Sequence, residues 1–372
     1  MSLTATGAST RQWVEAAKPG IRSLRPYQPG KPIEELAREQ GLSVDTIVKL
    51  ASNENPLGPA SSVLSAMRSA FADLSRYPDA NGFALKAALS EKLGVEPARI
   101  TLGNGSNDIL VLLAEAYLGP GLSAVYSEYA FFVYSLVTQA FDAQGIEVPS
   151  TRWGHDLTAM AAALRPDTRM VFLANPNNPT GTHFSQTELV TFLESVPEDV
   201  LVILDEAYFE YMAVPETMPL VDRFSNLVIT RTFSKAYGLA GCRVGYSVSH
   251  PDVADILNRI RQPFNVNNLG LVAAEAALKD TDYLARSRQI NQVGMAFLQS
   301  GFDAMGLMVI PSVCNFLCVD VGCDALPVYE AMLAQGVIVR PVNTYGMPRH
   351  LRISIGVQKE NERCLEVLKA VL

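Results

Sequence analysis

The sequence predicts an α/β protein with a mainly parallel sheet in a large domain, followed by a smaller α+β domain. Two observations support this prediction. From residue 100 onward, short apolar runs alternate with loops and helical stretches for about 150 residues, which is typical of parallel strands joined by crossover helices. After residue 263 the pattern changes to long helical stretches followed by strand-like runs, which indicates a second unit.

The composition is that of an ordinary globular protein. Of the 372 residues, 48% are hydrophobic and 18% are charged, and this length suggests two or three folding units. A net charge of −8 does not suit a nucleic-acid surface. No apolar run approaches the roughly 20 residues that span a bilayer, and the opening MSLTATGAST lacks the layout of a signal peptide. We therefore expect a cytoplasmic protein.

The cysteines and histidines follow no metal-binding pattern. The five cysteines form no disulfide framework, and the spacing of Cys314, Cys318 and Cys323 is not that of a zinc site. The four histidines are scattered along the chain. Metal chemistry is therefore not expected.

The N-terminal part predicts an extended arm before the first helices. Four prolines between residues 19 and 32 favour extended backbone, and a helix is expected near residues 33–40. The segment 47–59 is a short apolar run that ends in a turn-rich loop. Helical periodicity follows at residues 63–74 and 82–93.

The middle of the chain predicts the strands of the parallel sheet. Each is an apolar run that leads into polar or turn-forming residues, as buried parallel strands do when they carry chemistry at their carboxyl ends. A strand begins at residue 100 and is followed by an apolar helix that ends at Tyr117. Further strands are expected at residues 124–126, 170–174, 201–204, 227–230 and 242–249.

The last third of the chain predicts the smaller domain. Its expected elements are helical stretches over residues 269–305, strands at 315–321, 336–339 and 351–355, and a helix at 361–372. The whole chain is thus expected to have three parts. They are an N-terminal arm (1–48) that joins the small domain, a large domain (49–265), and a linking helix with the small domain (266–372).

Polar side chains gather where two apolar strands end. Asp205 and Tyr208 follow one strand, and Ser234, Lys235 and Arg243 follow the next. An acid, a phenol, an amine and a guanidinium beside an apolar sheet are costly to bury unless they act together. A lysine in a partly apolar pocket can lose its proton and act as a nucleophile, and an arginine offers a fork for phosphate or carboxylate.

Two loops rich in glycine and asparagine follow other strands. The loop GNGSN at residues 103–107 precedes a helix, so its backbone N–H groups suit a phosphate. The loop NPNNPTG at residues 175–181 offers the side-chain amide of Asn178, which can both donate and accept. Taken alone, each loop is also consistent with simple turn chemistry.

Together these groups fit one ligand, a phosphorylated aromatic cation with an aldehyde. Pyridoxal 5′-phosphate is such a molecule, because it needs a lysine for its aldehyde and an acid for its pyridinium nitrogen. It also needs a donor for its phenolic oxygen, and N–H, hydroxyl and arginine groups for its phosphate. The sequence therefore predicts pyridoxal phosphate as a cofactor.

The segments NPNNPTG, DEAY and SKAYGLAGCRVG resemble those of the fold-type I aminotransferases of the class-I/II group. The likeness extends over nearly the whole chain. The arm LRPYQPGKPIEELAREQGL, the segment IVKLASNENPLGP, RYPDANG and the terminal LRISIG resemble the histidinol-phosphate aminotransferase branch. The resemblance implies a fold-type I pyridoxal phosphate transferase with a seven-stranded sheet in its large domain, and a homodimer with shared active sites.

The resemblance implies roles for residues around the cofactor ring. Lys235 would bind the cofactor aldehyde and then move the proton at the substrate Cα, and Asp205 would pair with the pyridinium nitrogen. Tyr208 and Asn178 would hydrogen-bond the phenolic oxygen. Tyr129 would stack on the ring.

The resemblance also implies roles around the phosphate and the substrate. The cofactor phosphate would be held by Ser106, Asn107, Ser234 and Arg243. Tyr77 would reach this phosphate region from the partner subunit. Arg352 would grip the substrate's acidic group, and Tyr27 and Arg340 would lie around the substrate phosphate.

One segment departs from the family pattern. The residues before Tyr129 read YSEY, where family members commonly have prolines. Phe131 or Phe132 is therefore an alternative stacking residue.

The resemblance implies a reversible, ping-pong transamination in histidine biosynthesis, in which L-histidinol phosphate and 2-oxoglutarate give imidazole acetol phosphate and L-glutamate. Two arginines suit a phosphate dianion, and one also suits the carboxylate of glutamate. An aromatic amino acid aminotransferase is the alternative, because imidazole and benzene rings need similar flat apolar pockets. An enzyme like the threonine-phosphate decarboxylases and a non-catalytic ligand-binding protein are remote alternatives.

Overall fold

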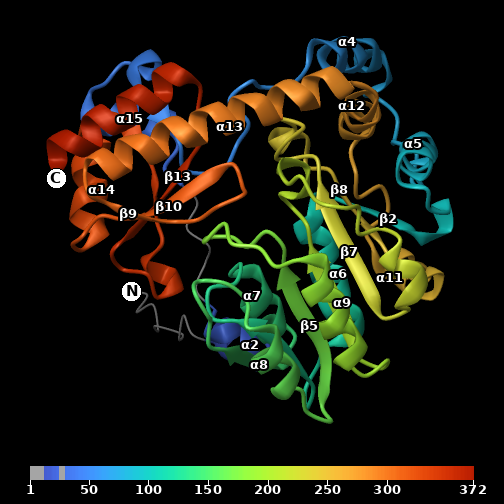
Figure 1. Ribbon diagram of the computed structural model, residues 1–372. Coiled ribbons are helices and arrows are strands. Elements are labelled where there is room, and N and C mark those ends of the chain that lie inside the picture. The colour runs from blue at the N-terminus through green and yellow to red at the C-terminus, as the bar shows by residue number, and fades with distance from the viewer. Residues whose placement is uncertain (1–11, 25–29) are drawn as a thin grey trace, which may run out of the picture.

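Two sheets connected by a long helix organise the structure, a computed structural model that describes residues 12–24 and 30–372 (Figure 1). One sheet has seven strands and the other has four, and a pair of short strands is separate from both. The long helix α13 (Thr281–Ala304) runs from the side of the large sheet to the small one (Figure 1).

The seven-stranded sheet has the strand order β2-β8-β7-β6-β5-β3-β4. Its strands are β2 (Ile100–Gly103), β3 (Ser123–Ser127), β4 (Gln144–Val148), β5 (Thr168–Ala174), β6 (Leu201–Asp205), β7 (Leu227–Thr232) and β8 (Gly245–Val248). Neighbouring strands are parallel except at β8, which is antiparallel to both β2 and β7. The expectation of a mainly parallel sheet is confirmed.

Two strands of this sheet differ from the expected pattern. The strand expected at residues 242–249 begins only at Gly245, because η5 (Ala240–Cys242) and Arg243 in the left-handed region precede it. The edge strand β4 has no counterpart among the expected strands. Of its residues only Val148 is buried, so β4 lacks the apolar run that marks the others.

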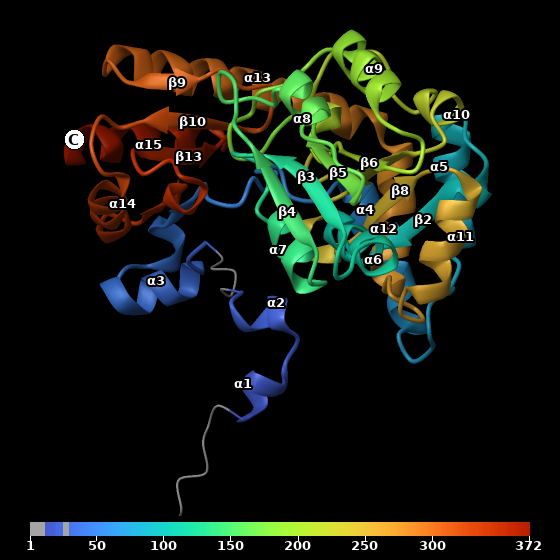
Figure 2. The same cartoon turned by 90° about the horizontal axis from the view of Figure 1, so that it is seen from below.

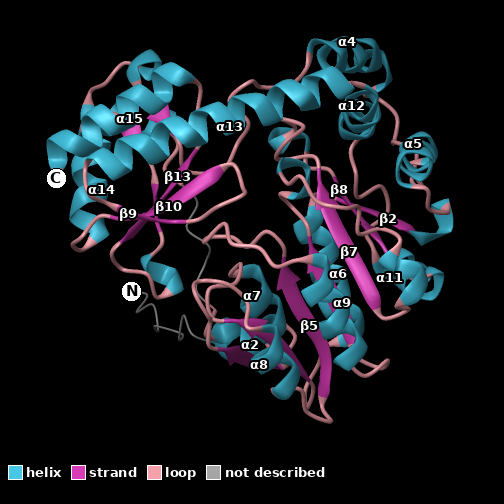
Figure 3. Ribbon diagram, viewed as in Figure 1, coloured by secondary structure: helices cyan, strands magenta, loops and turns pink. Residues whose placement is uncertain are grey.

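Helices cover both faces of the large sheet, as two-sided burial of its apolar strands requires (Figure 3). The helices packed on one face are α4 (Ser61–Ala70), α5 (Phe83–Leu93), α8 (Leu157–Ala162), α9 (Gln186–Ser195), α10 (Leu220–Arg223) and α12 (Asn268–Lys279). Those on the other face are α6 (Ser106–Tyr117), α7 (Val133–Ala140) and α11 (Pro251–Ile260). None of the described helices is long and apolar enough to cross a membrane.

The four-stranded sheet is antiparallel, with the order β12-β13-β10-β9. Its strands are β9 (Met308–Ile310), β10 (Phe316–Asp320), β12 (Arg340–Pro341) and β13 (His350–Ser354). The helices α13, α14 (Ala325–Ala334) and α15 (Gln358–Val371) enclose a core that includes Phe302, Leu317 and Val367. Around the loops lie the short 3-10 helices η1 (Val44–Thr46), η2 (Phe71–Asp73), η3 (Pro97–Arg99), η4 (Phe209–Tyr211) and η6 (Asn343–Tyr345).

The N-terminal segment contacts both parts of the molecule (Figure 2). The helix α2 (Pro19–Arg22) docks at the end of α7, where the Gly20 N–H donates to the Asp142 carboxylate. The helix α3 (Ile33–Gln40) and the strand β1 (Val48–Lys49) pack instead on the small-sheet side, and β1 pairs with β11 (Val337–Ile338). The residues expected to form a strand at 336–339 thus pair with β1 and lie outside the four-stranded sheet. The helix α1 (Gln12–Ala16) extends away from the body of the molecule (Figure 2).

Candidate active site

A cavity of about 400 Å³ lies where the carboxyl ends of β5, β6 and β7 face residues of the small sheet. Ten of the residues predicted for the site line it: Ser106, Asn107, Asn178, Asp205, Tyr208, Ser234, Lys235, Arg243, Arg340 and Arg352. The large sheet and its loops supply eight of these, and the small sheet supplies the two arginines. The structure therefore assembles one site from residues that are far apart in sequence.

Lys235 is half-buried in the loop after β7. Its Nζ donates to the Ser52 carbonyl oxygen at 3.1 Å and lies 5.8 Å from the centre of the Tyr208 ring. Burial, followed by the nearby charge of Arg352, lowers the pKa of Lys235 to about 8. A much larger fraction of this amine is therefore uncharged at neutral pH than is usual for a lysine, as a nucleophile or proton carrier requires.

Asp205 ends β6 and is 6% exposed. Its Oδ2 accepts from the Tyr134 hydroxyl at 2.9 Å and its Oδ1 accepts from the Thr230 hydroxyl at 3.1 Å. Burial raises the pKa of Asp205, whereas these two hydrogen bonds lower it. A buried carboxylate with two neutral donors is suited to a cationic ligand atom.

Tyr208 is buried beside the cavity and connects it to the small sheet. Its oxygen accepts from the Asn53 Nδ2 at 2.9 Å, which leaves the hydroxyl proton to be donated elsewhere. Asn53 in turn pairs with Ser354 of β13 through its backbone N–H and its side-chain oxygen. Burial raises the pKa of Tyr208, so this phenol remains a neutral donor.

The loop between β2 and α6 meets Arg243 at one end of the cavity. Ser106 is the first residue of α6, whose free backbone N–H groups favour an anion. A side chain at Gly105 would collide with the Arg243 guanidinium, since a Cβ there would lie 2.5 Å from Nη2. The Arg243 Nη1 also donates to the Ser234 hydroxyl at 3.3 Å. Backbone N–H, hydroxyl and guanidinium groups thus converge as donors.

Arg352 of β13 also lines the cavity and is 8% exposed. Its Nη1 donates to the Asn178 Oδ1 at 2.6 Å and its Nη2 to the Ala51 carbonyl oxygen at 2.8 Å. Its buried Nε has no hydrogen-bond partner among the described residues. Arg340 of β12 also lines the cavity and is the register partner of Arg352.

Three predicted site residues are not in this lining. Tyr129 packs on Trp153, with ring centres 5.2 Å apart, and the aromatic side chains that line the cavity from this segment are Phe131 and Phe132. Tyr77 is 82% exposed and stacks on Phe264. Tyr27 lies outside the described residues.

Other lining residues were not apparent from the sequence. They include Ser52, Asn53, Tyr134, Thr232 and Tyr345. Asn53 belongs to the turn-rich loop after residue 50. Its left-handed backbone (φ 53°), which is uncommon for a residue other than glycine, is seen only in the structure. Tyr134 resembles any other apolar-face residue of a helix, so no local pattern marks it.

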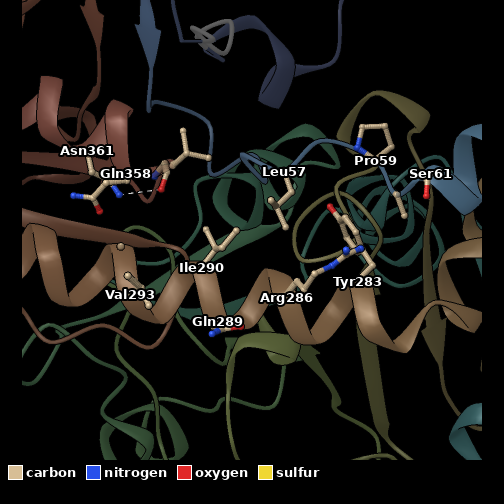
Figure 4. A pocket seen from close by; sticks show the side chains of 14 residues that line it. Leu57, Pro59, Ser61, Tyr283, Arg286, Gln289, Ile290, Val293, Gln358 and Asn361 are labelled. Atoms are coloured by element: carbon tan, nitrogen blue, oxygen red, sulfur yellow. Dashed lines mark hydrogen bonds between the residues drawn. The ribbon is translucent and has the colours of Figure 1, made fainter.

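Two larger cavities lie elsewhere. One, of about 760 Å³, follows α13 and is lined by Leu57, Arg286, Val293 and Gln358 among others (Figure 4). The other, of about 1000 Å³, involves the loop at residues 151–158 and helix α9. Neither contains a residue predicted for the site, and no cluster of metal-ligating side chains occurs in the described part of the chain.

The fold and the site together define an aminotransferase. The family model described as "Aminotransferase class I and II" matches residues 45–368, and the chain belongs to this family. An aspartate aminotransferase double mutant from Thermus thermophilus, 22% identical and with a TM-score of 0.83 over 95% of this chain and 99% of that one, shares the same fold.

The more similar proteins carry one name. The chain is 59% identical to "Histidinol-phosphate aminotransferase 2" of Pseudomonas fluorescens (strain Pf0-1), covering 96% of this chain and 97% of that protein. The protein of the same name from Pseudomonas aeruginosa is 58% identical over the same shares. A solved histidinol-phosphate aminotransferase from Sinorhizobium meliloti, in complex with pyridoxal-5′-phosphate, superposes with a TM-score of 0.88 at 32% identity, covering all of both chains.

Proposed function

We propose that this protein transfers an amino group between L-histidinol phosphate and 2-oxoglutarate, with pyridoxal phosphate as its cofactor. The observation that carries the proposal is that Arg340 and Arg352, register partners on adjacent strands, line the same cavity as Lys235. Two guanidinium groups beside a lysine of lowered pKa suit a substrate with both a primary amine and a phosphate. The relatives named for this activity, at 58–59% identity, support it.

The residues around the cavity fit each part of the cofactor. Lys235 would hold the aldehyde, and Asp205 would face the pyridine nitrogen. Tyr208 would donate to the phenolic oxygen. The helix α6 N-terminus and the Arg243 side chain, which contact each other closely at Gly105, would hold the phosphate. When bound, pyridoxal phosphate supplies an electron-withdrawing ring that stabilises negative charge at the substrate Cα.

Three protein side chains would then each have a task. Lys235 would take up and release the proton at the substrate Cα, which its lowered pKa permits near neutral pH. Asp205, buried and held by two hydroxyl groups, keeps a negative charge beside the ring nitrogen. Arg352, whose Nη1 already donates to Asn178, orients the substrate's acidic group.

The ring of the cofactor needs an aromatic partner. Because Phe131 and Phe132 line the cavity whereas Tyr129 packs on Trp153, we assign the stacking role to one of the two phenylalanines. This assignment replaces the expectation that Tyr129 stacks.

We also propose that the protein is a homodimer with shared sites. Exposed apolar side chains are concentrated in the segment between α4 and α5, where Tyr77, which is 82% exposed, stacks on Phe264, which is 38% exposed. Such a patch is typical of a protein–protein interface. In the dimer, Tyr77 would reach the cofactor phosphate of the partner subunit.

The proposed substrate is tested by single half-reactions. The pyridoxal phosphate form is mixed with L-histidinol phosphate, L-tyrosine, L-phenylalanine or L-glutamate, and conversion to the pyridoxamine form is followed by absorbance. We expect histidinol phosphate and glutamate to react faster than the aromatic amino acids. If phenylalanine reacts faster than histidinol phosphate, the aromatic alternative is correct. Formation of an amine product without 2-oxoglutarate exchange would instead indicate decarboxylation.

A further inference from the structure

Tyr134 is a buried residue of the site that was not predicted from the sequence. It lies in the first turn of α7, is fully buried, and lines the cavity. Its hydroxyl donates to the Asp205 Oδ2 at 2.9 Å. It therefore contacts the carboxylate that would face the pyridine nitrogen.

The ring of Tyr134 is held from two sides. It stacks on Phe172 of β5 with ring centres 4.8 Å apart and an interplanar angle of 5°. Phe131 packs edge-on against it at 5.9 Å. Since a ring packed this way has little freedom, its hydroxyl is fixed at one position relative to the carboxylate.

The surroundings of Asp205 give this hydroxyl an electrostatic effect. Two neutral hydroxyl groups, those of Tyr134 and Thr230, donate to the two oxygens of the Asp205 carboxylate. Burial and the neighbouring Asp205 raise the pKa of Tyr134, so the phenol stays neutral. A neutral donor stabilises the ionised carboxylate without cancelling its charge, whereas a cationic donor would cancel most of it.

We propose that Tyr134 is a positioning residue that acts through Asp205: it keeps the carboxylate ionised and aimed at the pyridine nitrogen of the cofactor. The proposal rests on the proposed function, because it assumes pyridoxal phosphate in this cavity. It assigns Phe172 the supporting task of fixing the phenol. Loss of the hydroxyl removes one of the donors to the Asp205 carboxylate and shifts Asp205 toward its protonated form.

The test compares Tyr134→Phe with Tyr126→Phe. Tyr126 is a tyrosine of the same hydrophobic cluster that lies outside the cavity lining, so Tyr126→Phe removes a tyrosine hydroxyl that does not contact Asp205. Each apoprotein is titrated with pyridoxal phosphate, and the ¹⁵N chemical shift of the labelled pyridine nitrogen is measured in the loaded protein. We expect Tyr134→Phe to weaken cofactor binding about 10-fold or more, as loss of a hydrogen bond to a charged group does, and to move the shift toward neutral pyridine. Tyr126→Phe should leave both unchanged.

A double-mutant cycle tests whether Tyr134 acts through Asp205. In an Asp205→Asn background, Tyr134→Phe should cause no further change in the ¹⁵N shift. In the glutamate half-reaction of the single variant, the maximal rate should fall while the concentration dependence stays the same. Equal cofactor affinity and equal ¹⁵N shifts in the two tyrosine variants would overturn the inference and leave the proposed function intact. If the protein without substitutions binds no pyridoxal phosphate, the inference about Tyr134 and the proposed function are both overturned.

Discussion

Arg340 of β12 and Arg352 of β13 are register partners on adjacent antiparallel strands. Side chains directly opposite in such a pair have Cβ atoms about 4.5–5.5 Å apart, where two like charges repel. Both residues line the same cavity, so the repulsion is placed where a dianion can relieve it. We interpret the pair as a binding element for the phosphate of the substrate.

Arg340→Ala is therefore expected to affect the two half-reactions unequally. The catalytic efficiency with L-histidinol phosphate should fall by about 10- to 100-fold, the range for one lost charge-assisted contact, while that with L-glutamate changes little. Rapid-mixing absorbance measures both. The matched control is Arg349→Ala, which removes a neighbouring arginine whose Nε instead pairs with Asp320 on an exposed surface. Equal losses with the two substrates would contradict the role of Arg340.

The lowered pKa of Lys235 predicts the pH dependence of cofactor uptake. Only the neutral amine attacks the aldehyde, and the pKa of Lys235 is about 8 rather than 10.5. The rate at which apoprotein binds pyridoxal phosphate covalently should rise through pH 8 and then level off. Because the charge of Arg352 contributes to the lowering, Arg352→Gln should move the midpoint to higher pH. The visible band should be absent in Lys235→Ala, and a rate that keeps rising beyond pH 10 would contradict the assignment.

The shared site predicts complementation between two defective variants. Lys235→Ala and Tyr77→Ala should each have little activity. A hybrid dimer would have one intact site, with Lys235 from one subunit and Tyr77 from the other. Equal mixing with exchange of subunits should restore about a quarter of the original activity, since half of the dimers are hybrid and half of their sites are intact. Mass spectrometry shows whether the mixture contains hybrid dimers. If hybrids form and activity does not recover, the two subunits do not share their active sites.

Glu210 lies outside the candidate site and predicts that the free energy of unfolding depends on pH. It is 7% exposed, its Oε2 has no partner among the described residues, and burial raises its pKa from 4.5 to about 7. A carboxyl with a raised pKa binds its proton more tightly in the folded protein, so stability is lost as pH rises from about 4.5 through 7. Glu210→Gln should remove this loss.

Chemical denaturation at two pH values measures this effect. At pH 8, Glu210→Gln should raise the free energy of unfolding by up to about 3 kcal/mol, whereas near pH 4.5 it should change little. Glu198→Gln, at an exposed position, is the control and should be neutral at both pH values. A gain of the same size at both pH values would show that titration of Glu210 is not the cause.

That the residues proposed for cofactor binding lie together could be predicted from the sequence, because they follow directly from local pattern. Asp205 and Lys235 come immediately after buried apolar strands, and parallel strands bring their carboxyl ends to one edge. Local pattern did not decide between Tyr129, Phe131 and Phe132 as the residue that stacks on the cofactor ring. The helix α7 begins at Val133, so the segment just before it turns Phe131 and Phe132 toward the cavity and Tyr129 toward Trp153. The division of the chain at residue 265 stays a prediction that limited proteolysis can test.

By itself the sequence predicted most of the strands and helices, the candidate lysine and acid, and the family, because each depends on residues that are neighbours along the chain. The tertiary structure decided the contacts between residues distant in sequence. It placed the Tyr134 hydroxyl on Asp205 with Phe172 behind its ring, and it set Arg340 opposite Arg352. These relationships depend on strand register and on how a helix packs against the sheet, and packing of side chains from separate elements fixes both.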